Sequence, residues 1–100
     1  MRLNDYQVET IVHAVLSRFN NNARVYLFGS RVDDAAKGGD IDLLVDLPEP
    51  DQQMVRHSCQ AVADIQMALG EQKIDLLVKH PNSTDQAIFH EALEHGVLLT

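Results

Sequence analysis

The pentapeptide Ile-Asp-Leu-Leu-Val occurs twice in this chain, at residues 41–45 and 74–78. Both copies are short, rich in branched aliphatic residues and soon followed by a proline, Pro48 or Pro81. This composition predicts a β-strand rather than a helix for each copy. Nothing around the two copies repeats, so we interpret them as two strands in similar surroundings and not as a duplicated domain.

The remaining segments alternate between helix and strand patterns. Apolar residues spaced by three and four predict a helix after the N-cap Asn4, and a second helix over Asp51–Leu69. A capping box at 83–86 predicts the start of a third helix, which runs to Gly96. The expected elements, in chain order, are a helix over 4–19, a strand over 24–28, a loop over 31–39, a strand over 40–47, a helix over 51–69, a strand over 73–79, the third helix and a short tail strand over 97–99.

This order predicts a single domain over residues 1–100 of mixed α/β (α+β) class. We expect a small three-stranded mixed sheet with the helices covering one of its faces. A chain of 100 residues buries one modest core, which excludes large multilayer enzymes.

Charge and composition narrow the function classes. Fifteen acidic and eight basic residues give a formal net charge of −7, which argues against nucleic acid as the main ligand and favours a divalent cation or a basic protein partner. The single cysteine, Cys59, excludes an internal disulfide, and we expect it to pack on the apolar face of its helix. No apolar run approaches membrane-spanning length, so we expect a cytoplasmic protein.

Two carboxylates share one face of the predicted strand over 40–47. Asp40 and Asp42 lie two residues apart, about 6–7 Å along a strand, and the alternating Ile41 and Leu43 point the other way. Such a pair repels itself unless water or a hard cation neutralises it, and Mg²⁺ prefers oxygen ligands. Asp75 joins them if the strand over 73–79 is a neighbour. The sequence therefore predicts a metal site built from three carboxylates.

Gly29 and Ser30 follow directly after the first predicted strand. A glycine in this place lets the backbone approach a ligand closely, and the following amides can bind phosphate oxygens. Arg31 is a candidate for contacting a phosphate or a base edge. The five histidines have no zinc-like spacing, and we interpret them as surface or packing residues.

A strand, Gly-Ser-Arg, a spacer and Gly-Asp-Ile-Asp-Leu-Leu-Val together resemble the signature of the DNA polymerase β-type nucleotidyltransferases. The minimal nucleotidyltransferase (MNT) domains are the most similar group, and the resemblance covers nearly the whole chain. The spacer between Ser30 and Asp40 is one residue shorter than the commonest family form, and Gly39 stands where serine is frequent.

The resemblance implies a nucleotidyltransferase fold and a role for each site residue. Gly29 and Ser30, with Arg31 beside them, would bind the triphosphate of ATP. Asp40 and Asp42 would bind Mg²⁺ or Mn²⁺, and Asp75 would complete the catalytic triad. MNT domains commonly pair with a HEPN-domain toxin, so the implied reaction is AMP transfer to a tyrosine hydroxyl of that RNase, and the implied role is that of an antitoxin.

Two other functions stay open at this point. The first alternative to the enzyme is a non-catalytic antitoxin that binds its partner and senses nucleotide. Modification of a small molecule, as in aminoglycoside nucleotidyltransferases, ranks last, because nothing here supplies a second domain to hold the acceptor. The sequence leaves the oligomeric state undetermined.

Overall fold

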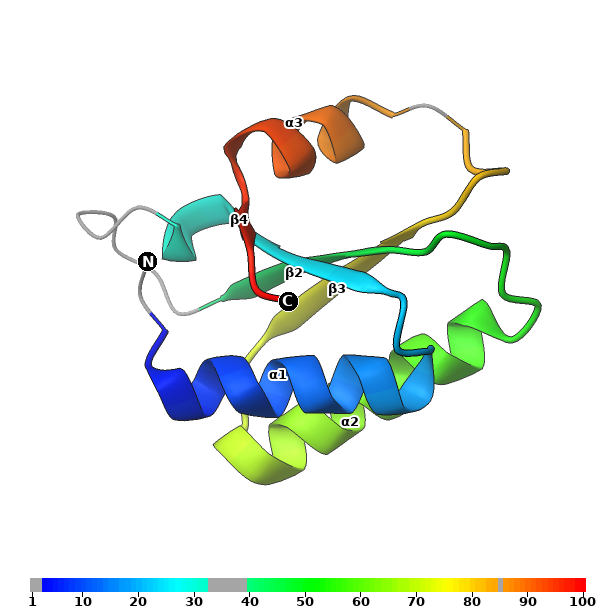
Figure 1. The fold of residues 1–100 in the computed structure, drawn as a ribbon. Coiled ribbons are helices and arrows are strands. Elements are labelled where there is room, and N and C mark those ends of the chain that lie inside the picture. The colour runs from blue at the N-terminus through cyan, green and yellow to red at the C-terminus, as the bar shows by residue number, and fades with distance from the viewer. Residues whose placement is uncertain (1–2, 33–39, 85) are drawn as a thin grey trace.

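The computed structural model describes residues 3–32, 40–84 and 86–100. Four strands form one sheet with helices on both sides (Figure 1). The elements are α1 (Asp5–Arg18), β1 (Arg24–Phe28), the 3₁₀ turn η1 (Gly29–Arg31), β2 (Ile41–Asp46), α2 (Met54–Leu69), β3 (Ile74–Lys79), α3 (Ala87–His95) and β4 (Val97–Leu98). The mixed α/β class is therefore confirmed.

The sheet has the strand order β3-β2-β1-β4, one strand more than predicted. β2 and β3 are parallel, and β1 is antiparallel to both β2 and β4. The tail strand joins the sheet because the chain turns sharply at Gly96 as α3 ends. A Cβ atom at Gly96 would lie 3.0 Å from the carbonyl oxygen of Leu27, so the absent side chain lets β4 reach β1.

The helices cover both faces of the sheet, and the prediction of one covered face was wrong. α1 and α2 lie on one side and α3 on the other (Figure 1). Leu44 of β2 and Phe28 of β1 point away from α1 and α2, so they form an apolar surface on the other side of the sheet. Phe89 and Ala92 of α3 pack against these two residues. The alternation of strand side chains thus supplies two cores.

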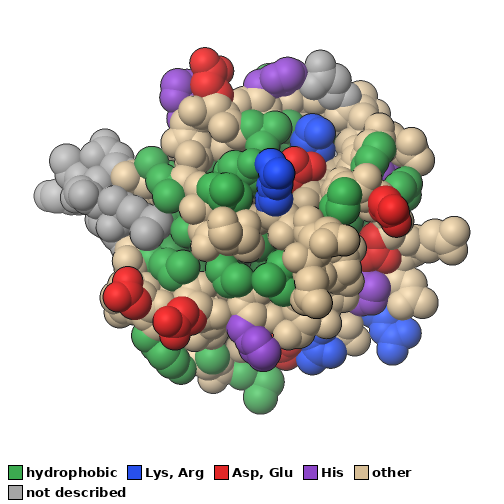
Figure 2. All heavy atoms as spheres, viewed as in Figure 1, with side chains coloured by type: hydrophobic (Ala, Val, Ile, Leu, Met, Phe, Trp, Pro, Cys, Tyr) green, Lys and Arg blue, Asp and Glu red, His purple; other side chains and the backbone are tan. Residues whose placement is uncertain are grey.

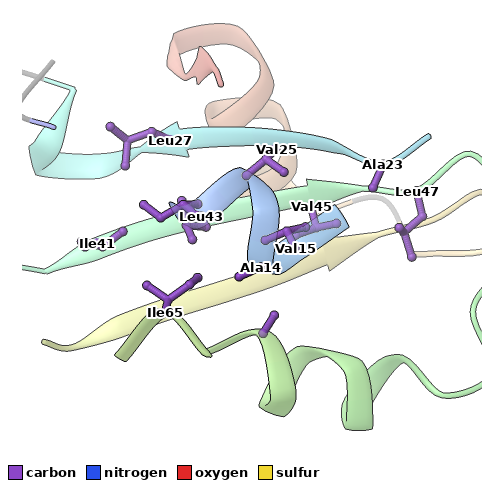
Figure 3. Close-up of a cluster of buried hydrophobic side chains, with 12 residues drawn as sticks. Ala14, Val15, Ala23, Val25, Leu27, Ile41, Leu43, Val45, Leu47 and Ile65 are labelled. Atoms are coloured by element: carbon purple, nitrogen blue, oxygen red, sulfur yellow. The ribbon is translucent and has the colours of Figure 1, made fainter. Parts of the chain in front are cut away.

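The larger core fills the space between the sheet and helices α1 and α2 (Figure 3). Ile41, Leu43 and Val45 are fully buried there, as the alternation along β2 predicts. Ile11 of α1 and Ile65 of α2 are also fully buried. This packing buries one side of β2, while its other side carries Asp42 and Asp46.

The second helix is shorter than predicted, and the residues that it buries differ in part from the predicted apolar stripe. It begins at Met54 rather than Asp51, because the Asp51 side chain accepts a hydrogen bond from the Gln53 amide at 2.8 Å and contacts His57 Nδ1 at 2.5 Å. Ala61 and Ile65 face the core, whereas Cys59 is exposed, so its expected packing role was wrong.

The third helix starts after the predicted capping box rather than in it. Its first residue is Ala87, and the preceding Gln86 makes no side-chain capping bond. The Ser83 hydroxyl is used elsewhere, because it accepts a hydrogen bond from the His80 amide at 3.0 Å in the turn after β3. Asp85, which lies within the predicted box, is outside the described residues.

The first helix begins as predicted at the N-cap Asn4. The Asn4 side chain accepts from the Gln7 amide at 2.8 Å, and the Gln7 side chain accepts from the Asn4 amide at 2.9 Å. At the other end of α1, Arg18 makes a two-point ion pair with Asp64 of α2, with one N–O distance of 2.7 Å. This pair links the two helices, which pack together through the apolar core.

The face of the molecule seen in Figure 2 shows hydrophobic side chains between scattered charged groups. Within the described part of the chain, none of the helices is long and apolar enough to cross a membrane.

Candidate active site

The parallel register of β2 and β3 aligns the two copies of the repeated pentapeptide residue for residue, with Ile41 opposite Ile74. The residues that flank the copies have opposite charges. Lys73 Nζ lies 3.8 Å from Asp40 Oδ2, and Lys79 Nζ lies 4.0 Å from Asp46 Oδ1. These two ion pairs favour this register over any slipped one.

Asp42 and Asp75 form a like-charge pair across β2 and β3, whereas the charged residues at the strand ends pair with opposite charges. They stand directly opposite each other on the α3 side of the sheet. Partial burial of Asp42 raises the pKa of its carboxyl, and the nearby Asp75 charge, a side-chain hydrogen bond with Asp75 and the Asp40 charge raise this pKa further. Like charges in this position cost folding free energy, so the fold keeps a pair that does not stabilise it.

Gly29 gives Asp42 the room it occupies. β1 ends opposite Asp42, since Phe28 is its register partner, and Gly29 follows with a φ of +75°. A Cβ atom at Gly29 would overlap Asp42 Oδ2 and lie 3.1 Å from its Cγ. The backbone at the start of η1 therefore lies directly against Asp42. This close approach is possible because Gly29 has no side chain, as the sequence predicts for this glycine.

The structure brings two of the three predicted acids into direct contact. Asp40 is exposed and lies near enough to influence Asp42, but its own ion pair is with Lys73. Arg31 is half-buried and donates a hydrogen bond to Gln72 Oε1 at 3.3 Å. Ser30 lies in η1 between Gly29 and Arg31, and the glycines at 38 and 39 fall outside the described residues.

The Asp42–Asp75 pair suits a divalent cation. Across the ranges that the structure describes, no group of three or more His, Cys, Asp or Glu side chains is arranged to hold a metal ion. The donor set present is therefore two carboxylates, which is the number that Mg²⁺ commonly takes from a protein beside substrate phosphates. A positive charge here would also relieve the repulsion that raises the pKa of Asp42.

A groove of about 680 Å³ opens beside the acidic pair. It runs along β3 and is lined by apolar side chains of both cores together with the two carboxylates. Phe28 and Ile88 line it on the α3 side, and Val62 lines it on the α2 side. Sequence reasoning missed this groove because its walls come from elements far apart in the chain.

Lys73 was also missed, although the sequence carried a signal for it. With one flanking residue at each end, the two segments read Asp-Ile-Asp-Leu-Leu-Val-Asp at 40–46 and Lys-Ile-Asp-Leu-Leu-Val-Lys at 73–79. Their opposite flanking charges predict that the two strands pair in register, and the parallel orientation places Lys73 beside Asp40.

Comparison with known families agrees with this geometry. Residues 10–100 match the family described as Polymerase beta, Nucleotidyltransferase. The chain belongs to this family. No curated protein matches the chain. As a family member it is a nucleotidyltransferase-domain protein, and its mixed sheet flanked by three helices is consistent with that fold.

The raised pKa of Asp42 predicts a pH-dependent stability difference in the metal-free protein. The folded state binds this proton more tightly than the unfolded chain, so the proton's stabilisation is fully present below pH 3.8 and is lost as pH rises through the folded pKa. Asp42→Asn should therefore be more stable than wild type at neutral pH, by less than about 1 kcal/mol because solvent screens the pair.

Urea unfolding of both proteins between pH 3 and pH 7, in EDTA, measures this difference. We expect the advantage of Asp42→Asn to shrink as pH falls toward 3.8. An advantage that grows on acidification would contradict the assigned direction.

Proposed function

We propose that this domain catalyses metal-dependent transfer of AMP from ATP to a tyrosine hydroxyl of a HEPN-type toxin, and that it acts as the antitoxin. The observation that carries the proposal is the Asp42–Asp75 pair. Opposed carboxylates beside a close backbone turn at Gly29 are what a nucleotidyltransferase needs to bind a metal-chelated triphosphate.

The two acids differ in exposure, and this difference supports different roles. Asp42 is half-buried against Gly29 and serves in binding, whereas Asp75 is exposed and open to an incoming acceptor. In the proposed reaction the acceptor oxygen attacks the α-phosphorus, and Asp75 takes the hydroxyl proton. The bond from the α-phosphorus to the bridging oxygen breaks, and pyrophosphate leaves.

A divalent ion held by Asp42 and Asp75 would neutralise charge on the triphosphate and the leaving pyrophosphate. Asp40, exposed and paired with Lys73, would join these ligands by giving up that ion pair. An ion pair between exposed groups is weak, so the exchange costs little. The amides of η1, after Gly29, would bind phosphate oxygens.

A protein acceptor fits the exposure of Asp75. Its carboxylate stands on the outermost strand of the sheet, where a hydroxyl carried by another macromolecule can reach it. The net charge of −7 gives the domain an attraction for a basic partner such as an RNase.

Label transfer tests the proposal. The purified domain, a HEPN-domain RNase, Mg²⁺ and α-labelled ATP are incubated, and the RNase is analysed by gel and mass spectrometry. We expect a tyrosine-linked AMP that is absent in EDTA and with Asp42→Asn. γ-Labelled ATP is the matched control, since a nucleotidyltransferase leaves that phosphate in pyrophosphate. Transfer of the γ-label, or neutralisation of the RNase with no label, would contradict AMP transfer.

A further inference from the structure

β3 presents an open strand edge in the part of the chain that the structure describes. It is an outermost strand of six residues, and among the described residues it pairs only with β2. One of its faces is apolar, whereas the other carries Asp75 and Lys79 on either side of Leu77. The groove described above runs beside it. A long edge of this kind is a template for another strand.

The hydrogen bonds of the sheet show which backbone groups face this edge. The amides of Ile41 and Leu47 in β2 donate to the carbonyls of Lys73 and Lys79 at 3.0 Å and 2.8 Å. Backbone groups of successive strand residues point to alternate sides within the sheet plane. The odd-numbered residues of β3 therefore face β2, and the amide and carbonyl of Leu76 and Val78 face outward.

We propose that two copies of this chain pair antiparallel through β3, around a two-fold axis at Leu77, and form one continuous eight-stranded sheet. In this register Leu76 of each copy stands opposite Val78 of the other, so the outward backbone groups exchange hydrogen bonds. Asp75 of each copy stands opposite Lys79 of the other, on the α3 side of the joined sheet.

Charge selects this register among the neighbouring ones that keep both faces aligned. An axis at Leu76 would place Lys73 opposite Lys79 of the second copy, and an axis at Asp75 would oppose two aspartates. Both of these alternatives set like charges across the strands. An axis at Val78 would place Lys79 opposite Leu77 of the second copy and would form no ion pair. The axis at Leu77 gives two ion pairs. Self-complementarity of this kind is what a two-fold interface requires.

The charged groups around the axis are accessible to a second copy. Asp75 is exposed, and Lys79 keeps 35% of its side chain accessible while it contacts Asp46. The apolar groove residues Val62 and Ile88 lie beside the edge on the two sides of the sheet, where a second copy would cover them. If the proposed function holds, this dimer and an acceptor at Asp75 exclude each other.

Sedimentation of the full chain tests the proposal without nucleotide or toxin, so its result is independent of the proposed function. We expect a reversible dimer between about 1 and 500 μM, and at least a tenfold weaker one for Lys79→Glu, which sets an acidic side chain opposite Asp75 of the second copy. The double variant Asp75→Lys with Lys79→Glu should restore the dimer. Asp46→Asn, which removes only the contact of Lys79 within one copy, should leave it unchanged.

Disulfide formation tests the register. In a Cys59→Ser background, Leu77→Cys should cross-link under mild oxidation, because directly opposite residues outside the hydrogen-bonded pairs bring their Cα atoms to about 4.5 Å. Leu98→Cys, on the other edge strand, is the control and should stay uncross-linked. A wild-type monomer at all concentrations, a dimer unaffected by Lys79→Glu, or cross-linking only through Leu98→Cys would overturn the proposal. Circular dichroism establishes that each variant is folded.

Discussion

Replacing Asp75 with asparagine should abolish AMP transfer and leave the fold intact. In the proposed mechanism Asp75 takes the proton of the acceptor hydroxyl, and loss of a general base lowers a rate by about 10²–10⁴-fold. The same substitution removes the charge that opposes Asp42 in the ladder, so we expect an unchanged or raised melting temperature. Label transfer from α-labelled ATP and thermal unfolding in EDTA measure the two effects.

Asp46→Asn is the matched control for this experiment. Asp46 lies on the same face of β2 as Asp42 but at the far end of the strand, where its neighbour is Lys79. It has no place in the proposed site, so this variant should transfer AMP at the wild-type rate. Neutralisation of the toxin in cells separates the two functions, since an Asp75→Asn protein that still neutralises would show that the antitoxin acts by binding alone.

Gly29→Ala should damage both stability and nucleotide binding. The positive φ of Gly29 disfavours any side chain, which costs about 1–3 kcal/mol. The added methyl group would also overlap the Asp42 carboxylate and push it from its place opposite Asp75. We expect a lower melting temperature and at least a tenfold loss of affinity for a Mg²⁺-bound, non-hydrolysable ATP analogue, measured by calorimetry.

Gly70→Ala separates strain from the effect on the site. Gly70 ends α2 with a φ of +92°, and a Cβ atom there would meet no other atom within 4 Å. This variant should lose stability through backbone strain and keep wild-type nucleotide affinity. Equal affinities for the two glycine variants would show that the contact between Gly29 and Asp42 does not matter for binding.

Local patterns predicted most of the elements. β1 has the predicted bounds, and β2, β3, α1 and the tail strand lie where alternation, helical spacing and capping placed them. The predicted starts of two helices failed because a side chain has a competing partner. Ser83 accepts a hydrogen bond in the turn after β3 instead of capping α3. Asp51 accepts a hydrogen bond from the Gln53 amide in the segment before α2 and is not part of the helix.

The site was only partly predictable for a related reason. The sequence indicated that Asp42 and Asp75 occupy equivalent positions in two similar strands, and the pairing of those strands makes them neighbours. The position of Asp40 depended on Lys73, whose relation to it appears only when the flanking residues of both strands are compared. The groove was not predictable, because its lining comes from α2, β3 and α3 together.

The sequence by itself determined what is local: which segments are strands and helices, which face of β2 is apolar and which is acidic, and where glycine must stand. These properties follow from backbone stereochemistry and side-chain alternation within a few residues. Only the tertiary structure decided that α3 crosses to the acidic side of the sheet, and that β4 and β3 form its two edges. Such choices depend on which apolar surfaces pack together, and that free energy arises between segments far apart in the chain.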